Sequence, residues 1–270
     1  KAHVLGITGA PGAGKSTLID SIAISARTAG KKVAIIAVDP SSPFSGGAVL
    51  GDRIRMSRIG GDGDIYLRSL ATRGALGGLS RACYDSITIL DAAGYDLVII
   101  ETVGVGQSEI DVVQLADSVV VILVPGMGDG VQAFKAGILE IADIFVINKA
   151  DRDGTNSLER ELLTLIATND PDSNLWKQKV ALTVATEGKG TPELLGILKE
   201  HSEWLKSSAV AKSKKQSNLE LLILKIFSEQ LVTKLKNLKN VKISELAEKL
   251  YLKKISIYEA LENLNNSSER

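Results

Sequence analysis

Eight residues near the amino end, Gly-Ala-Pro-Gly-Ala-Gly-Lys-Ser at 9–16, constrain the fold of this chain more than any others. They match the pattern G-x-x-x-x-G-K-[ST], in which backbone N–H groups of a glycine-rich turn surround a phosphate group. An apolar run at 2–8 precedes the turn, and a proline-free stretch with helical spacing at 17–29 follows it. A strand, a glycine turn and a helix start are the context that this loop requires. We therefore predict a nucleotide phosphate site here, and not an ordinary strand-to-helix turn.

The residues of this loop have expected roles in holding the nucleotide. The predicted phosphate-binding set is Gly9, Ala10, Pro11, Gly12, Ala13, Gly14, Lys15, Ser16 and Thr17. Lys15 is expected to neutralise the β- and γ-phosphates and thereby to be catalytic, and the Ser16 hydroxyl is expected to bind Mg²⁺.

Short apolar runs alternate with helical stretches along most of the chain. Runs with the character of strands occupy residues 4–8, 32–39, 95–101, 118–124, 143–148 and 180–185. This alternation predicts an α/β fold built on a mostly parallel sheet, the fold of a P-loop NTPase. Ligands of such sheets bind at the carboxyl ends of the strands, where each motif described below also falls.

The sequence Asn-Lys-Ala-Asp at 148–151 follows one of these strands and matches the guanine motif N-K-x-D. The Asp151 carboxylate would accept hydrogen bonds from guanine N1–H and the exocyclic amine, a pair of donors that adenine lacks. The four-letter match is short, but its place beside Asn148 and Lys149 at a strand end favours GTP over ATP. Ala185 and Thr186 follow the last strand, and we expect a backbone amide there to contact the guanine oxygen.

Three carboxylates at strand or loop ends, Asp39, Asp52 and Glu101, are candidates for a metal site. Together with Ser16 they offer the oxygen ligands that Mg²⁺ prefers, and we predict that they support catalysis. Gly104 is expected to donate its N–H to the γ-phosphate. Two alternatives stay open, since Asp39 precedes a proline and would suit a turn, and Asp52 would be simply solvated in its loop.

Two further features bear on hydrolysis and signalling. Val105 follows Gly104 at the place where Ras-like proteins carry a glutamine that orients the attacking water. We therefore expect slow intrinsic hydrolysis, or hydrolysis completed by a partner. Three glycines within residues 126–130 indicate a backbone that changes shape, with Asp129 and Lys135 flanking it.

Composition argues against several other classes of protein. The single cysteine, Cys83, rules out an internal disulfide and a cysteine-rich zinc site. His3 and His201 are far apart in the sequence, so we expect no metal cluster from them, and His3, which alternates with apolar residues in a strand, is expected to have a structural role. No 18-residue apolar run is present, so no membrane span is expected. The chain starts at Lys1 and not at Met, so any targeting segment would precede it; we expect a cytoplasmic protein, or a mitochondrial matrix protein in a eukaryote.

The last part of the chain is predicted to be an appendage to a nucleotide-binding domain at 1–206. Residues 207–217 have the composition of a linker, and residues 219–238 carry apolar side chains at helical spacing. Two shorter amphipathic helices are predicted at 241–250 and 255–264, with Ser244 and Ser256 as their N-caps. Residues 206–270 hold 13 basic and 7 acidic side chains but few aromatics, which favours a solvated helical face over nucleic-acid binding.

Seven segments, in order, resemble the MeaB/ArgK family of G proteins. They lie at 6–17, 38–43, 51–53, 73–80, 101–109, 126–132 and 148–151, and the resemblance extends over residues 2–206. This family comprises the GTPase chaperones of adenosylcobalamin-dependent methylmalonyl-CoA mutase and includes the methylmalonic aciduria type A protein of humans.

The resemblance implies a SIMIBI-type fold, the class that includes signal-recognition GTPases and nitrogenase iron protein. It implies that Asp39, Asp52 and Glu101 serve a Mg²⁺ site, and that Asp129 and Lys135 belong to a switch that relays nucleotide state to a mutase. The expected ligands are GTP, GDP and Mg²⁺. The expected function is GTP hydrolysis that gates cofactor loading into methylmalonyl-CoA mutase, or a related acyl-CoA mutase, and protects or reactivates that enzyme.

The resemblance further implies a homodimer formed through the helical arm, with no nucleic-acid or membrane partner. Two features depart from the family. We expect no counterpart, within residues 1–270, of the helical amino-terminal extension usual in the family, and Ala185-Thr186 stands where Ser-Ala is common.

Three alternative functions stay open beside this one. A nickel-delivery maturation GTPase shares both nucleotide motifs but needs His or Cys ligands, which are scarce here. A kinase of a transport protein needs a phosphoacceptor site, and no segment resembles one. A nucleic-acid-binding arm would show salt-dependent binding to DNA or RNA.

Overall fold

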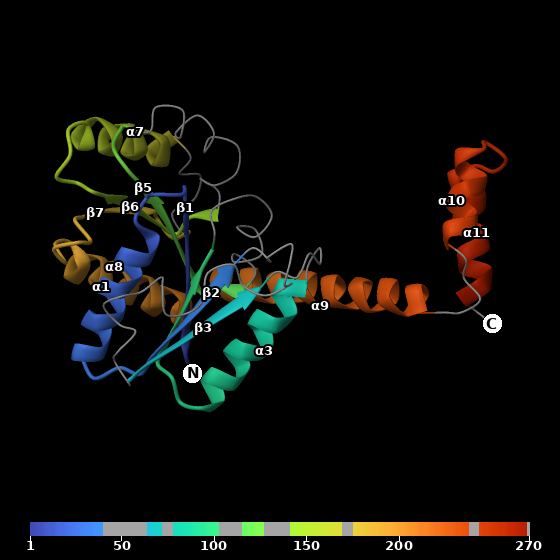
Figure 1. The fold of residues 1–270 in the computed structure, drawn as a ribbon. Coiled ribbons are helices and arrows are strands. Elements are labelled where there is room, and N and C mark those ends of the chain that lie inside the picture. Colours follow the sequence, from blue (N-terminus) through green and yellow to red (C-terminus); the bar gives the residue numbers. More distant parts are fainter. Residues whose placement is uncertain are drawn as a thin grey trace. The chain divides into compact units, whose positions relative to one another are not determined.

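A parallel sheet forms the centre of the nucleotide-binding unit (Figure 1). The computed structural model describes residues 1–39, 64–71, 78–102, 115–126, 141–168, 175–237 and 243–268. Within them, strands pair in parallel in the order β3-β2-β4-β1-β5-β6-β7. The strands are β1 (His3–Gly9), β2 (Val33–Asp39), β3 (Ile65–Ala71), β4 (Leu97–Glu101), β5 (Ser118–Leu123), β6 (Ile144–Asn148) and β7 (Lys179–Thr183). The predicted α/β fold with a parallel sheet is confirmed.

Helices cover both faces of the sheet. They are α1 (Lys15–Thr28), α3 (Gly78–Ala92), α7 (Thr155–Thr168) and α8 (Thr191–Ser207). Leu5 and Ile7 of β1 pack in a buried cluster with residues of α1 and α8, whereas Val4 packs with residues of α3 on the opposite face. Residues of α7 cover the β5–β6 part of that opposite face. Because both faces are covered, the central strands are apolar throughout, as the sequence indicated.

The six predicted strands are present, but β3 at the edge of the sheet was missed. Ile65 in β3 is buried, whereas Tyr66 is exposed and contacts Tyr95 edge to face. The polar residues Arg68 and Ser69 lie within the strand, so its sequence is less apolar than those of the central strands. The inward–outward alternation of Ile65, Tyr66 and Leu67 is the signal that could have revealed it.

The expected linker at 207–217 is wrong, because helix α9 (Ala209–Asn237) begins only one residue after α8 ends. Ser208 separates the two helices, and its hydroxyl accepts a hydrogen bond from the N–H of Ala211 at 3.2 Å. The segment holds four serines, but its three lysines, two alanines and one glutamine favour a helix. Contacts divide the chain into a first unit, Lys1–Leu222, and a second, Ile223–Arg270, so the division falls inside α9.

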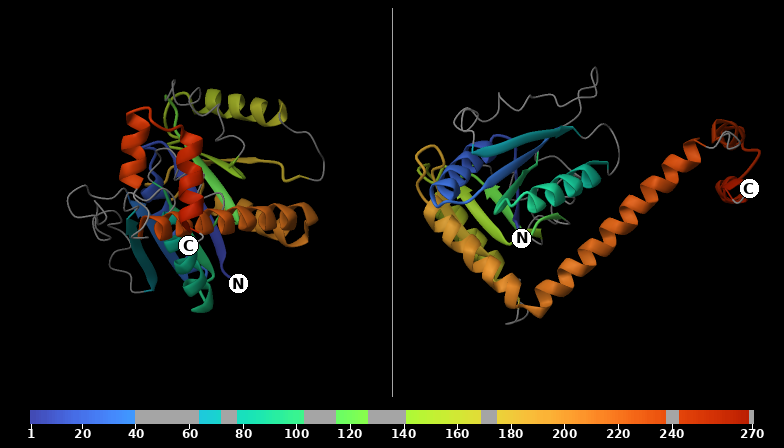
Figure 2. Two further views of the ribbon diagram at one scale, coloured as in Figure 1. Left: turned by 90° about the vertical axis from the view of Figure 1, so that its right-hand side faces the viewer. Right: turned by 90° about the horizontal axis from the view of Figure 1, so that it is seen from below.

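The second unit contains the end of α9, helix α10 (Ile243–Tyr251) and helix α11 (Ile257–Ser268). Both short helices were predicted. Ser256 caps α11: its hydroxyl accepts from the N–H of Glu259 at 3.2 Å, while the Glu259 carboxylate accepts from the Ser256 N–H at 2.7 Å. Ser244, the other predicted cap, lies inside α10 and is not its N-cap. Figure 2 shows the two short helices from two further directions.

No helix in the described ranges is long and apolar enough to cross a membrane.

A hydrogen-bonded chain of side chains joins three elements at the amino ends of the strands. The hydroxyl of Ser118 at the start of β5 lies 2.9 Å from Nε2 of His3 and 2.6 Å from Nδ1 of His201 on α8. The two histidines, separated in sequence, are therefore neighbours in space. Burial lowers the pKa of each histidine to about 4, so both are neutral at pH 7.

These histidines make stability sensitive to acid. Their folded-state pKa lies below the unfolded value of 6.5, so the unfolded chain binds more protons once the pH falls below about 6.5. We expect the free energy of unfolding to decrease between pH 6.5 and 4, by at most about 3 kcal/mol for each histidine. Asp143 opposes this loss, because burial raises the pKa of its carboxyl.

Urea unfolding followed by circular dichroism at pH 7, 6 and 5 measures this effect. His201→Asn keeps a polar partner for Ser118 without the titration, so its loss of stability between pH 7 and 5 should be smaller than that of the parent chain. Equal losses in both proteins would exclude His201 as the cause.

Candidate functional site

The phosphate-binding loop lies at the carboxyl end of β1, as predicted. Gly14 adopts a left-handed conformation with φ 89° and directly precedes α1. A Cβ at Gly14 would collide with the Nδ2 atom of Asn148, and a Cβ at Gly9 would lie only 2.5 Å from the carbonyl oxygen of Ile122. Glycine is therefore required at both positions by the close approach of β6 and β5. Helix α1 begins directly at this turn, and the N–H groups of a helix start suit an anion.

Lys15 is buried within this loop. Its Nζ donates to the carbonyl oxygens of Gly9 at 2.7 Å and Ala10 at 3.1 Å. The ammonium is thus held beside the turn, where a phosphate group would need its charge.

Ser16 and Glu101 form the part of the predicted metal site that the described residues include. The hydroxyl of Ser16 donates to Oε1 of Glu101 at 2.6 Å, although 85 positions separate them. Glu101 ends β4, which pairs with β1, and its side chain is buried. Two hard oxygen ligands beside a phosphate-binding loop suit Mg²⁺.

Two residues of the guanine motif form hydrogen bonds with the phosphate-binding loop. Asn148, at the end of β6, donates from Nδ2 to the carbonyl oxygen of Ala13 at 2.9 Å. Lys149 has φ 57° and donates from Nζ to the carbonyl oxygen of Gly12 at 2.8 Å. The guanine motif and the phosphate-binding loop, which are far apart in the sequence, are therefore joined by direct hydrogen bonds.

The remaining guanine residues lie at the same edge. Asp151 is exposed, two residues beyond Lys149, so its carboxylate is accessible to a base. The N–H of buried Ala185 donates to Oδ1 of Asn148 at 3.2 Å, and exposed Thr186 follows it. In this structure the Ala185 amide is occupied by Asn148, so its predicted contact with guanine stays a prediction.

Sequence reasoning missed the residue that orients Asn148. Thr183, at the end of β7, lies opposite Asn148 in the parallel register and donates its hydroxyl to Oδ1 at 3.1 Å. A polar residue closing a strand beside another polar strand end was the available signal.

Five predicted residues lie wholly or partly outside the described part of the chain. The backbone of Asp39 ends β2, but its side chain is not described; Asp52, Gly104, Asp129 and Lys135 are not described at all. Their roles stay predictions. In the sequence these residues end or follow β2, β4 and β5, strands whose carboxyl ends lie at the edge that holds the phosphate-binding loop.

Comparisons with known proteins agree with this geometry. Residues 1–240 match the family model described as methylmalonyl Co-A mutase-associated GTPase MeaB. A protein of Pyrococcus abyssi named as a GTPase is 48% identical over 262 residues, covering 96% of this chain and 81% of its own length. One from Pyrococcus horikoshii is 52% identical over 221 residues, covering 81% and 70%. The mitochondrial methylmalonic aciduria type A homolog of Mus musculus is 35% identical over 231 residues, covering 84% of this chain and 56% of its own.

Solved structures share the fold. The crystal structure of LAO/AO transport system kinase matches with a TM-score of 0.72 and 24% identity, covering 100% of this chain and 82% of that one. The structure of HypB from Helicobacter pylori in complex with nickel matches with a TM-score of 0.54 and 19% identity, covering 75% and 88%. At these identities the likeness concerns the fold alone.

Proposed function

The chain belongs to the MeaB family of methylmalonyl-CoA mutase-associated GTPases, and from this premise we propose that it acts as a nucleotide-driven chaperone of an adenosylcobalamin-dependent acyl-CoA mutase. It is a GTPase and binds guanine nucleotides. The main observation behind the proposed nucleotide site is that Asn148 and Lys149 of the guanine motif donate hydrogen bonds directly to the phosphate-binding loop. Methylmalonyl-CoA mutase is the proposed client, for which GTP hydrolysis would gate cofactor loading and support protection or reactivation.

We propose that Mg²⁺ is held by Ser16 and Glu101, with Asp39 and Asp52 completing the site. The 2.6 Å contact between the Ser16 hydroxyl and Glu101 supports this, because Ser16 belongs to the phosphate-binding loop and Glu101 ends the strand that pairs with β1. When bound, Mg²⁺ would neutralise charge on the transferring phosphoryl group. Lys15 would hold the β- and γ-phosphates, and the N–H groups at the start of α1 would orient them. Gly104 is proposed to contact the γ-phosphate.

The client proposal is tested by mixing the full chain with recombinant methylmalonyl-CoA mutase from the same source. Residues 126–135, with Asp129 and Lys135, are the proposed relay of nucleotide state. We therefore expect complex formation on size exclusion to differ between GDP and a non-hydrolysable GTP analogue. The mutase should also accelerate GTP hydrolysis at least tenfold, since no glutamine follows Gly104 to orient the water. No complex with either nucleotide would contradict the client assignment but leave the GTPase assignment intact.

We propose a homodimer formed through the arm. In the second unit, α9 exposes Ile223, Leu224, Phe227, Leu231 and Val232, with exposed fractions between 43% and 65%. So many exposed apolar side chains on one helix mark an interaction surface.

Replacing Phe227 and Leu231 together by Glu should convert a dimer at micromolar concentration into a monomer that still binds GDP. Light scattering measures the mass. Ser228→Glu with Gln230→Glu adds the same charge to exposed polar positions of this helix and should leave the dimer intact. A monomeric parent chain, or a dimeric Phe227/Leu231 variant, would refute the arm interface.

Nickel delivery and protein phosphorylation gain no support beyond a shared fold. Among the described residues, no group of three or more His, Cys, Asp or Glu side chains is placed to hold a metal ion. The cytoplasmic or mitochondrial location stays a prediction.

A further inference from the structure

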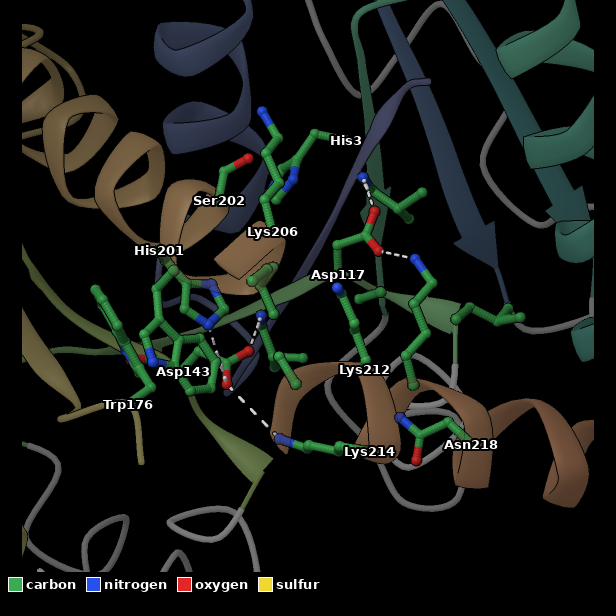
Figure 3. A pocket seen from close by; sticks show the side chains of 18 of the residues that line it. His3, Asp117, Asp143, Trp176, His201, Ser202, Lys206, Lys212, Lys214 and Asn218 are labelled. Carbon is green, nitrogen blue, oxygen red and sulfur yellow. Dashed lines mark hydrogen bonds and ion pairs between the residues drawn. The ribbon is translucent and has the colours of Figure 1, made fainter. Parts of the chain in front are cut away.

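We propose that a cavity at the amino edge of the sheet binds a small amphiphilic anion, a molecule with an apolar body and one anionic head group. The cavity has a volume of about 1160 Å³ and lies among α3, α7, α8, the start of α9 and the amino ends of β1, β5 and β6 (Figure 3). The phosphate-binding loop follows the other end of β1, about 20 Å away for a strand of seven residues. This site is therefore separate from the nucleotide site.

Apolar side chains supply most of the lining. Leu163 on α7, Leu175 before β7, and Val210 and Leu219 on α9 are between 39% and 49% exposed, although they surround one cavity. Trp176 adds a flat surface and is held in place by its indole N–H, which donates to the carbonyl oxygen of Asp143 at 2.9 Å. Apolar surface thus lies beside charged side chains in this cavity, and sites for organic ligands combine apolar walls with polar groups that orient the ligand.

The aspartates that line the cavity accept hydrogen bonds from backbone N–H groups. Asp91 accepts from the N–H of Ala2 and Asp96 from that of Lys32. Asp117 accepts from the N–H of Val4 at 2.9 Å, and Asp143 from that of Val119 at 2.8 Å. These carboxylates thus serve the amino ends of strands.

Two of them are also neutralised by the start of α9. Lys215 forms an ion pair with Asp117, and Lys214 lies 3.8 Å from Asp143. Figure 3 shows the contact between Lys214 and Asp143. The carboxylates are therefore poor partners for a further cation.

The lysines of the lining leave positive charge available. Seven lysines line the cavity against four aspartates, and the two histidines there are neutral at pH 7. Lys206 on α8 and Lys212 on α9 form no ion pair with a carboxylate in the described ranges, and Figure 3 draws both around this space. The apolar walls would hold the body of a ligand, and these two ammonium groups would attract its anionic head.

Binding, and not catalysis, is the role that this chemistry supports. Ser118, His201 and Asp143 are the residue types of a hydrolytic triad, but Ser118 is fully buried. Its hydroxyl also lies within hydrogen-bond distance of both His3 and His201, which fixes it as a structural link. A nucleophile must be reachable by its substrate, so we assign no reaction to this cavity.

Tryptophan fluorescence gives a selective measurement, because the chain has two tryptophans, Trp176 and Trp204, and both line this cavity. The full chain, with GDP present, is titrated with dodecanoate below its micelle concentration. Dodecyl maltoside and dodecyltrimethylammonium serve as neutral and cationic ligands of the same chain length. We expect the tryptophan fluorescence to change saturably with dodecanoate. The apparent affinities for dodecyl maltoside and dodecyltrimethylammonium should be at least tenfold weaker.

The variant Lys206→Ala with Lys212→Ala should weaken dodecanoate binding about three- to tenfold, as loss of two partly screened charges predicts. Lys249→Ala with Lys254→Ala removes the same charge from the second unit and should leave the affinity unchanged. GDP affinity should be equal in all three proteins, which shows that each is folded. Equal binding of the three dodecyl compounds, no saturable change with dodecanoate, or equal dodecanoate affinity in the Lys206/Lys212 variant would each overturn the proposal.

Discussion

Asp151→Asn is expected to lower the affinity for GDP about 100-fold or more and to create affinity for xanthosine diphosphate. The carboxylate of Asp151 is proposed to accept hydrogen bonds from guanine N1–H and from the exocyclic amine. The side-chain amide of the Asn variant has only one acceptor, so its NH₂ group would face one of these two donors. Xanthine carries a carbonyl where guanine has its amine, so it would pair with the amide instead. Titration calorimetry of the parent chain and the variant with GDP, ADP and xanthosine diphosphate measures how the affinity for each nucleotide changes.

Asp153→Asn is the matched control, since Asp153 is exposed only two residues away. It should bind GDP like the parent chain, which would separate a specific contact from a change in surface charge. Unchanged GDP affinity in Asp151→Asn, or equal ADP and GDP affinity in the parent chain, would remove Asp151 from the guanine site.

Glu101→Gln should reduce the rate of GTP hydrolysis about 100-fold while changing GDP affinity only a few-fold. The substitution keeps the size of the side chain and a partner for the Ser16 hydroxyl. It removes the charge proposed to help hold Mg²⁺, which acts on charge that develops as the phosphoryl group transfers. Phosphate release measured over a range of Mg²⁺ concentrations should show a higher Mg²⁺ requirement as well.

Glu161→Gln removes the same charge from an exposed position on α7 and should hydrolyse GTP normally. If Glu101→Gln matched that control in rate and in Mg²⁺ requirement, Glu101 would be only a structural partner of Ser16. A parallel loss of GDP affinity would instead indicate a damaged phosphate-binding loop.

Most of the sheet could be predicted because its central strands have both faces covered and are therefore apolar throughout. Edge strand β3 has one exposed face and carries Arg68, so its signal was weaker. The composition of 207–217 was misleading for a different reason. Its serines and lysines predict a solvated linker, but Lys214 and Lys215 form ion pairs with Asp143 and Asp117 at the amino ends of the strands, a contact that only the folded chain provides.

The nucleotide site was predictable as a set of residues because motifs at strand ends must meet at one edge of a parallel sheet. The bonds among them were not predictable. Asn148 reaches Ala13 across 135 positions, and no local pattern specifies such a partner. The amino edge was missed for the same reason, since Ser118 unites His3 and His201 only through the strand order.

The unbroken course of α9 restricts how its length can change. Each residue of a helix advances the chain by about 1.5 Å and turns it by about 100°. Inserting one residue between Lys215 and Leu219 would therefore turn Leu219, which lines the cavity, and buried Leu222 to a different side of the helix axis, relative to the lysines that form ion pairs with Asp117 and Asp143. A flexible tether would absorb such an insertion, but a helix transmits the rotation to these two side chains. The spacing along this part of α9 thus sets an angle as well as a distance.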